Sequence, residues 1–430
     1  MAKTFREYEP DQLLLLPPSL SDWVPEGHLA RFVSDVVDEL DLEGIEGSYE
    51  EDRGQPPYHP RMMVKVLVYS YATGVYSSRR IARQLIDSVA FRYLGAGNSP
   101  DFRTVNAFRS RHGEALSGLF GQVLRMCSRS GLVKLGKVAV DGTKIKANAS
   151  KHKAMSYGRM EEQEEALQAQ VEELLRRAEE VDREEDELYG ADKRGDELPE
   201  ELAHRESRLK KIREAKAALE QEAREKAAAT GKNPEKAKPQ GRAQRNFTDP
   251  ESRIQKTSDG FIQGYNAQIA VDAQAQVIVA QHVTSAAPDV EELIPAVNAI
   301  GRALRQRPEK ILADAGYWSE HNVQTLTTRG ISAYIAPRRY KHSEPIPAAP
   351  RGRIPKAISA KDRMQRKLQT LSGRAIYAAR MVLPEPVFGQ IKAARGFRQF
   401  LRRGLKAVGQ EWALICTAHN LLKLHQAQTA

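Results

Sequence analysis

The chain has 430 residues, of which 41% are hydrophobic and 28% charged, and its formal net charge is +10. This length exceeds one ordinary compact domain and predicts two or three parts, while the positive charge favours a polyanionic partner. No stretch approaches the roughly 20 apolar residues of a membrane span. The only cysteines, Cys127 and Cys416, exclude a disulfide framework, so we expect buried thiols in a cytoplasmic protein.

Residues 1–125 predict a helical domain. Apolar residues recur at helical spacing from Pro60 to Tyr76, again after Ser77, and from Phe102, in a third helix that is expected to include Leu116. Short helices, tight turns and many arginines are typical of a helix-turn-helix DNA reader, and a helical bundle with a solvated basic face is the alternative. The arginines concerned are Arg79, Arg80, Arg83, Arg103, Arg109 and Arg111.

A change of composition follows this domain. Residues 132–152, which predict a short buried strand ending at Asp141, are expected to be the first part of an α/β core. From Glu161 to Glu187 there are 13 acidic and 3 basic residues, with apolar residues at heptad-like spacing. A basic helix comes next, so residues 153–245 predict an antiparallel coiled-coil hairpin and a linker.

Strand signals return in residues 246–425, the predicted remainder of the core. Segments 264–272 and 276–284 are joined by a tight turn and predict an antiparallel pair, and two further buried strands, 310–314 and 332–336, alternate with helices. With the hairpin set aside, this order predicts an α/β mixed sheet that opens with a three-strand meander. That is the order of the ribonuclease H-like fold.

Three acidic residues are candidates for catalysis. Asp141 and Asp314 each end a predicted strand, where open α/β sheets place their sites, although turn capping is the alternative for either one alone. From residue 338 to residue 406 the chain has 18 basic and 3 acidic residues, and Glu385 is one of the three. Three carboxylates can hold two Mg²⁺ ions about 3.5–4 Å apart for in-line displacement at phosphorus.

These residues resemble the DDE transposases of bacterial insertion sequences, in the group whose catalytic helix carries the signature Y-(2)-R-(3)-E-(6)-K. Tyr377, Arg380, Glu385 and Lys392 match it, except that four residues rather than three separate Arg380 from Glu385. The stretches VAVDGTKIKANAS, ILADAGYWS and GYNAQIAVD are similar to this group as well. So are the basic helical N-terminal domain and the charged coiled-coil insertion.

The resemblance implies a ribonuclease H-like core that binds terminal inverted repeats, cuts DNA with water as the nucleophile, and joins the freed 3′-hydroxyl to target DNA. It implies that Asp141, Asp314 and Glu385 ligate two Mg²⁺ ions per active site, for which Mn²⁺ can substitute. Double-stranded DNA is the expected partner, bound by a homodimer or a larger assembly. The residues expected to contact DNA are Tyr377, Arg380, Lys392, Arg79, Arg80, Lys144 and Trp318.

Several alternatives stay open. Lys144 could be a solvated lysine, and Tyr317 and Trp318 could pack against the sheet instead of stacking on an unpaired base. The chain could also be a metal-dependent nuclease of the same fold that performs no strand transfer. A non-catalytic DNA-binding regulator that dimerises through the coiled coil is the alternative from another functional class.

Overall fold

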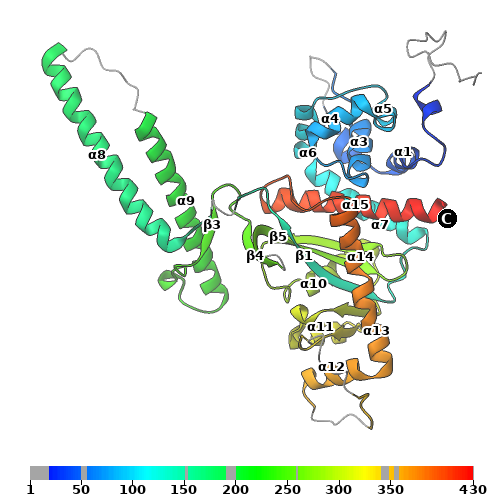
Figure 1. Ribbon diagram of the computed structural model, residues 1–430. Helices are drawn as coiled ribbons and strands as arrows, with labels where there is room; N and C mark the ends of the chain where they lie inside the picture. Colours follow the sequence, from blue (N-terminus) through cyan, green and yellow to red (C-terminus); the bar gives the residue numbers. More distant parts are fainter. Residues whose placement is uncertain are drawn as a thin grey trace, which may run out of the picture.

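Figure 1 shows a group of helices, a helix-covered sheet and a long two-helix hairpin that projects away from the sheet. Within the described part of the chain, none of the helices combines the length and apolar character needed to cross a membrane. The computed structural model describes residues 19–49, 56–150, 154–189, 200–257, 260–339, 348–352 and 358–429, and it leaves out the side chains of residues 175 and 177–203.

The N-terminal part is helical, as predicted. Its third expected helix is two helices, because α6 ends at Arg111 and Leu116 lies in α7. A Cβ atom on Gly113, at the start of α7, would lie 2.1 Å from Gln410 Oε1, so the Gln410 side chain of α15 packs directly against this glycine. The elements are η1 (Leu20–Trp23), α1 (Leu29–Glu39), α2 (Glu43–Glu46), α3 (Pro60–Ala72), α4 (Ser78–Asp87), α5 (Val89–Leu94), α6 (Phe102–Arg111) and α7 (Gly113–Arg129).

The core is a mixed sheet, as predicted. Strands β1, β5 and β6 form the antiparallel meander, β7 and β8 continue the sheet parallel to β1, and β4 pairs with the first part of β5. The long strand β5 therefore has β1 on one side and both β4 and β6 on the other. The strands are β1 (Val138–Lys146), β4 (Arg253–Thr257), β5 (Gly260–Asp272), β6 (Ile278–Thr284), β7 (Lys310–Ala313) and β8 (Ser332–Ile335).

Helices cover the sheet and connect it to the N-terminal part. Helix α15 runs between the N-terminal helices and the sheet (Figure 1) and packs against α3, α7 and β6. Its Trp412 is fully buried and donates Nε1–H to the backbone oxygen of Gln268, 3.2 Å away. The helical elements here are α10 (Leu293–Leu304), α11 (Glu320–Thr328), α12 (Ala360–Gln369), α13 (Leu371–Val382), α14 (Pro384–Gly389), the π-helical turn η5 (Gln390–Ala394) and α15 (Leu405–Thr429).

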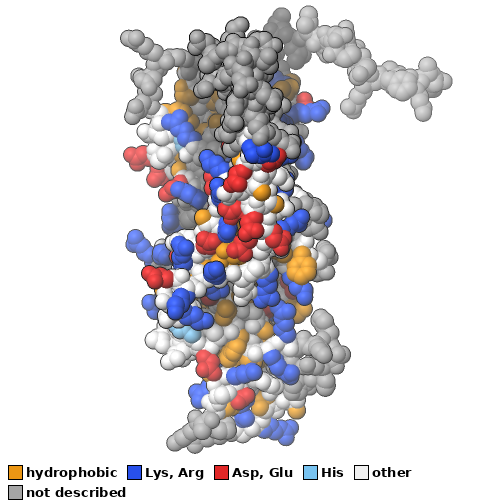
Figure 2. All heavy atoms as spheres, turned by 90° about the vertical axis from the view of Figure 1, so that its left-hand side faces the viewer, with side chains coloured by type: hydrophobic (Ala, Val, Ile, Leu, Met, Phe, Trp, Pro, Cys, Tyr) orange, Lys and Arg blue, Asp and Glu red, His pale blue; other side chains and the backbone are white. Residues whose placement is uncertain are grey.

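The insertion forms a hairpin of helices α8 (Tyr157–Tyr189) and α9 (Glu200–Ala229), which pack against each other. Its base is closed by the short antiparallel strands β2 (Ala154–Ser156) and β3 (Gln244–Asn246), with η3 (Pro234–Lys236) in the returning segment. Among its described side chains, Met160, Leu167, Leu209, Ile212 and Leu219 form a small separate core. Seen from the hairpin side, Lys and Arg spread over the surface, while Asp and Glu gather near its middle (Figure 2).

Candidate active site beside two parallel strands

Asp141 and Asp314 lie side by side. The parallel register of β1 and β7 pairs Val140 with Ala313, and each aspartate is the next residue along the chain. Asp314 directly follows β7, as predicted. The predicted end of the first strand at Asp141 is wrong, because β1 continues to Lys146 through its antiparallel pairing with β5. Asp314 begins the turn η4 (Ala315–Tyr317), and its Oδ1 accepts a hydrogen bond from Gly316 N at 2.7 Å. The Oδ1 of Asp141 accepts one from Gly142 N at 2.8 Å. Two residues 173 positions apart in the sequence thus lie next to each other where the pairing of β1 with β7 ends.

The electrostatics of Asp141 favour a cation here. Burial, and to a lesser extent the negative charges of Asp314 and Asp289, raise the pKa of Asp141 to about 6, although the Gly142 N–H and the Arg380 guanidinium oppose the shift. A carboxylate that is both desolvated and next to another carboxylate is stabilised by a bound metal ion. This pair of oxygen ligands therefore fits a hard divalent cation such as Mg²⁺.

The signature residues lie on consecutive helical elements. Tyr377 and Arg380 belong to α13, Glu385 is in the first turn of α14, and Lys392 is in η5. Helices α13 and α14 both pack against β1. The additional residue between Arg380 and Glu385 falls where α13 ends and Pro384 begins α14. Proline lacks the N–H that would continue the hydrogen bonding of α13, so the signature is split by a helix break.

Two cationic side chains of the signature lie close to Asp141. The Lys392 ammonium donates to Thr143 Oγ1 and to the Lys144 backbone oxygen, 3.2 Å away in the latter case. Thr143 shares the sheet face of Asp141, since side chains alternate along a strand. Arg380 lowers the pKa of Asp141, and its Nε is buried without a hydrogen-bond partner in the described structure. Positive charge thus borders the carboxylate pair.

Glu385 is placed differently from the two aspartates. It is exposed on α14, and no hydrogen bond or ion pair to its carboxylate is found within the described residues. In the described parts of the chain, no three Asp, Glu, His or Cys side chains converge as a complete metal site. The structure therefore brings Asp141 and Asp314 together and leaves Glu385 on a neighbouring helix.

Comparison with known proteins identifies the family. The model of a transposase domain (DUF772) matches residues 18–111, and that of a transposase DDE domain matches residues 229–421, which contain Asp314 and Glu385. The chain belongs to the DDE-type insertion-sequence transposases. A candidate transposase for insertion sequence element IS402 of Burkholderia cepacia is 38% identical over 85 residues, covering 18% of this chain and 40% of that relative. No solved structure matches the chain.

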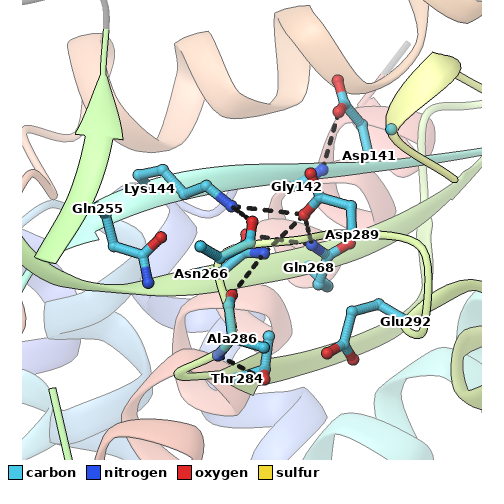
Figure 3. A network of polar contacts seen from close by, with 12 residues as sticks. Asp141, Gly142, Lys144, Gln255, Asn266, Gln268, Thr284, Ala286, Asp289 and Glu292 are labelled. Atoms are coloured by element: carbon cyan, nitrogen blue, oxygen red, sulfur yellow. Dashed lines mark hydrogen bonds and ion pairs between the residues drawn. The ribbon is translucent and has the colours of Figure 1, made fainter. Parts of the chain in front are cut away.

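Three residues next to the aspartates of this transposase point inward. Lys144 Nζ donates to the Ala287 backbone oxygen at 3.0 Å and lies 3.4 Å from Asp289 Oδ1 (Figure 3), and burial lowers its pKa. Tyr317 is fully buried, and Trp318 is half-buried against the core. Tyr317 is therefore packed inside the protein and is not available to stack on a DNA base. Trp318 remains partly accessible beside Asp314.

The arginines of the N-terminal helices separate into two groups. Arg79 and Arg80 are exposed at the start of α4, with Arg79 Cζ 4.9 Å from the ring centroid of Phe102 on α6. Arg109 was expected on a DNA-reading surface, but this is wrong because its side chain is buried. Its Nη1 donates to the Tyr71 hydroxyl and to the Tyr76 backbone oxygen, each 3.0 Å away, so Arg109 joins helices within the protein.

Sequence reasoning missed one acidic residue of the site. Asp289, between β6 and α10, accepts hydrogen bonds at Oδ1 from Asn266 Nδ2 and Gln268 Nε2, at 2.6 and 2.8 Å. A signal for this network was present, because Asn266 and Gln268 are polar residues at alternate positions of a buried strand of this transposase. Such alternation places both amides on one face of the sheet, where they need polar partners.

Proposed function

We propose that this transposase binds the terminal inverted repeats of its element, cleaves DNA by metal-dependent hydrolysis and joins the 3′-hydroxyl end to target DNA by transesterification. The observation that carries the proposal is the adjacent pair Asp141 and Asp314, in which burial and the second negative charge raise the pKa of Asp141 to about 6. A ribonuclease H-like core is part of the proposal. The antiparallel meander followed by two parallel strands supports it.

Asp141 and Asp314 would hold the metal ions, with the exposed Glu385 as the third ligand. Two bound Mg²⁺ ions would supply an activated water and stabilise the leaving oxygen at phosphorus. The chain itself orients the two aspartates through the Gly142 and Gly316 amides. Arg380 and Lys392 would contact the phosphates of the cleaved strand from the Asp141 side, since both cations already border that residue.

DNA would be held over a larger surface by the N-terminal helices. Arg79 and Arg80 are exposed on α4, and such side chains can contact the backbone of a duplex. Tyr377 and Trp318, both partly accessible, are proposed to contact DNA near the cleavage site. Lys144 is left out of these proposed DNA contacts because its ammonium is paired with Asp289. A homodimer or larger assembly on DNA remains part of the proposal.

The proposal is tested with supercoiled plasmid, Mg²⁺ or Mn²⁺ and the full-length protein. We expect Asp141→Asn, Asp314→Asn and Glu385→Gln each to reduce the rate of cleavage by more than about a hundredfold. Residues that only orient a metal ligand typically cost about 10- to 100-fold when they are replaced, so a ligand itself should cost more. Binding of DNA, measured by fluorescence anisotropy, should stay unchanged. Glu320→Gln is the matched control, since Glu320 is also an exposed acid in the first turn of a helix, α11.

The products distinguish the alternatives. Joined products indicate a transposase, whereas nicked or linear plasmid without joining indicates a nuclease of the same family. Binding of DNA by the wild-type protein with no cleavage in either metal indicates a regulator. Loss of DNA binding in the three site variants, in parallel with cleavage, would show that these acids stabilise the fold rather than perform the reaction.

A further inference from the structure

A set of polar side chains lies on the sheet face opposite the side chain of Asp141. It comprises Asn266 and Gln268 of β5, Asp289 after β6, and Tyr317 of η4, and we call it the amide clamp. Asn266, Gln268 and Tyr317 are each 0% exposed. Figure 3 shows the two amides and Asp289 pointing toward one another, while Asp141 points away from them. Polar groups buried in this way must satisfy each other, so their orientations are strongly constrained.

Asp289 determines the orientation of the Gln268 amide. A carboxylate only accepts hydrogen bonds, so the Gln268 nitrogen must face Asp289, to which it donates at 2.8 Å. The Gln268 oxygen is thereby turned toward the Tyr317 hydroxyl and accepts its hydrogen bond. Burial, together with the charges of Asp289, Asp141 and Asp314, holds the pKa of Tyr317 well above its ordinary value, so the hydroxyl stays a donor.

The Gln268 amide contacts structure next to both aspartates, the backbone of Gly142 and the side chain of Tyr317. A Cβ atom on Gly142, the residue after Asp141, would lie 2.2 Å from Gln268 Nε2, so the amide packs directly against this backbone. On the other side, Tyr317 ends the turn that Asp314 begins. Gln268 therefore contacts the neighbour of Asp141 and, through one hydroxyl, the turn of Asp314.

We propose that Gln268 is a positioning residue of the active site. It holds the turn of Asp314 at a fixed distance from the backbone of Asp141 by contacting Gly142 and by accepting the Tyr317 hydrogen bond. This inference rests on the proposed function of the two aspartates as metal ligands. Loss of a residue that orients metal ligands typically reduces metal affinity by about 10- to 100-fold.

The test removes one hydroxyl with Tyr317→Phe in the full-length protein and compares it with Tyr265→Phe. Tyr265 is also fully buried and donates its hydroxyl to a carboxylate, Asp249 Oδ1, at 2.7 Å, but it lies on the other face of β5. Mn²⁺ affinity is measured by calorimetry. Hydrogen exchange is followed at the Gly316 amide, which donates to Asp314.

We expect Tyr317→Phe to lower Mn²⁺ affinity about tenfold and to speed exchange at Gly316, with neither change in Tyr265→Phe. Wild-type Mn²⁺ affinity in Tyr317→Phe, or unchanged exchange at Gly316, would overturn the inference. If the wild-type protein binds no Mn²⁺, the proposed metal site fails instead. The exchange at Gly316 then still decides whether the clamp positions the turn of Asp314.

Discussion

The α/β core and the helical hairpin both bind acidic side chains through polar contacts, but under different conditions. In the core, Glu411 is 2% exposed and accepts hydrogen bonds from the backbone N–H groups of Leu401 and Arg402, at 3.0 and 3.2 Å. In the hairpin, Glu164 pairs with Arg213 at 3.0 Å, and their side chains are 21% and 49% exposed. The donor-to-acceptor distances are similar in the two regions, whereas the access of water is not.

This difference in hydration decides what each contact can do. Water and salt screen an exposed pair, so it contributes little to stability and orients nothing else. A buried polar group has lost its water and must keep its protein partners, so it fixes the elements that carry them. Side chains are therefore positioned for chemistry in the α/β core. The hairpin is stabilised mainly by its own small cluster of apolar side chains.

Removing Glu411 should have the largest effect on stability. Its Oε1 accepts a hydrogen bond from the Tyr71 hydroxyl at 3.4 Å, and Tyr71 in turn contacts Arg109, so α15, α3 and α6 are joined. Glu411→Ala removes the negative charge that stabilises the buried Arg109 guanidinium and should lower the free energy of unfolding by about 3–5 kcal/mol. Urea unfolding measures this loss, and a change below about 1 kcal/mol would contradict the importance of burial.

Replacing His419 should change the free energy of unfolding by an intermediate amount that depends on pH. Burial and the charge of Arg395 lower its pKa to about 3, and its Nε2 lies 3.0 Å from the Gln276 backbone oxygen. The unfolded chain binds a proton near pH 6.5 and the folded chain does not, so stability falls as the pH drops below about 6.5. Between pH 7 and pH 5 the free energy of unfolding of the wild type should fall by roughly 2 kcal/mol more than that of His419→Gln.

The control for this prediction is His425→Gln, which changes a more accessible histidine on the same helix. Its unfolding free energy should follow that of the wild type from pH 7 to pH 5. Equal pH dependence of His419→Gln and the wild type would show that His419 takes up its proton without unfolding.

The smallest effect is expected in the hairpin. Arg213→Ala removes the ion pair with Glu164 and a hydrogen bond from Nη2 to Gln168 Oε1 at 2.6 Å. Since these groups are largely hydrated, the free energy of unfolding should fall by at most about 1 kcal/mol, and less at high salt. Thermal unfolding at two salt concentrations measures this. A loss as large as that of Glu411→Ala would remove the distinction between the two regions.

Local sequence patterns predicted much of this architecture. Short apolar runs that end in an acid indicated the strands carrying Asp141 and Asp314, because a buried strand and its polar end are both local features. The antiparallel pair after the insertion and the two helices of the hairpin were predicted for the same reason. The Y-R-E-K signature, from Tyr377 to Lys392, marked the helical segment that packs against β1.

Contacts between distant segments could not be predicted in this way. The sequence by itself determined which residues are charged and that an aspartate comes directly after the apolar run of each of two buried strands. It did not determine where the first strand ends, because β1 continues past Asp141 to Lys146. Only the tertiary structure decided that Arg109 turns inward, that Lys144 pairs with Asp289, and that the Gln268 amide packs against Gly142 and accepts the Tyr317 hydrogen bond. The physical reason is that burial assigns partners to a polar side chain, and burial is a property of the packed chain rather than of any local pattern.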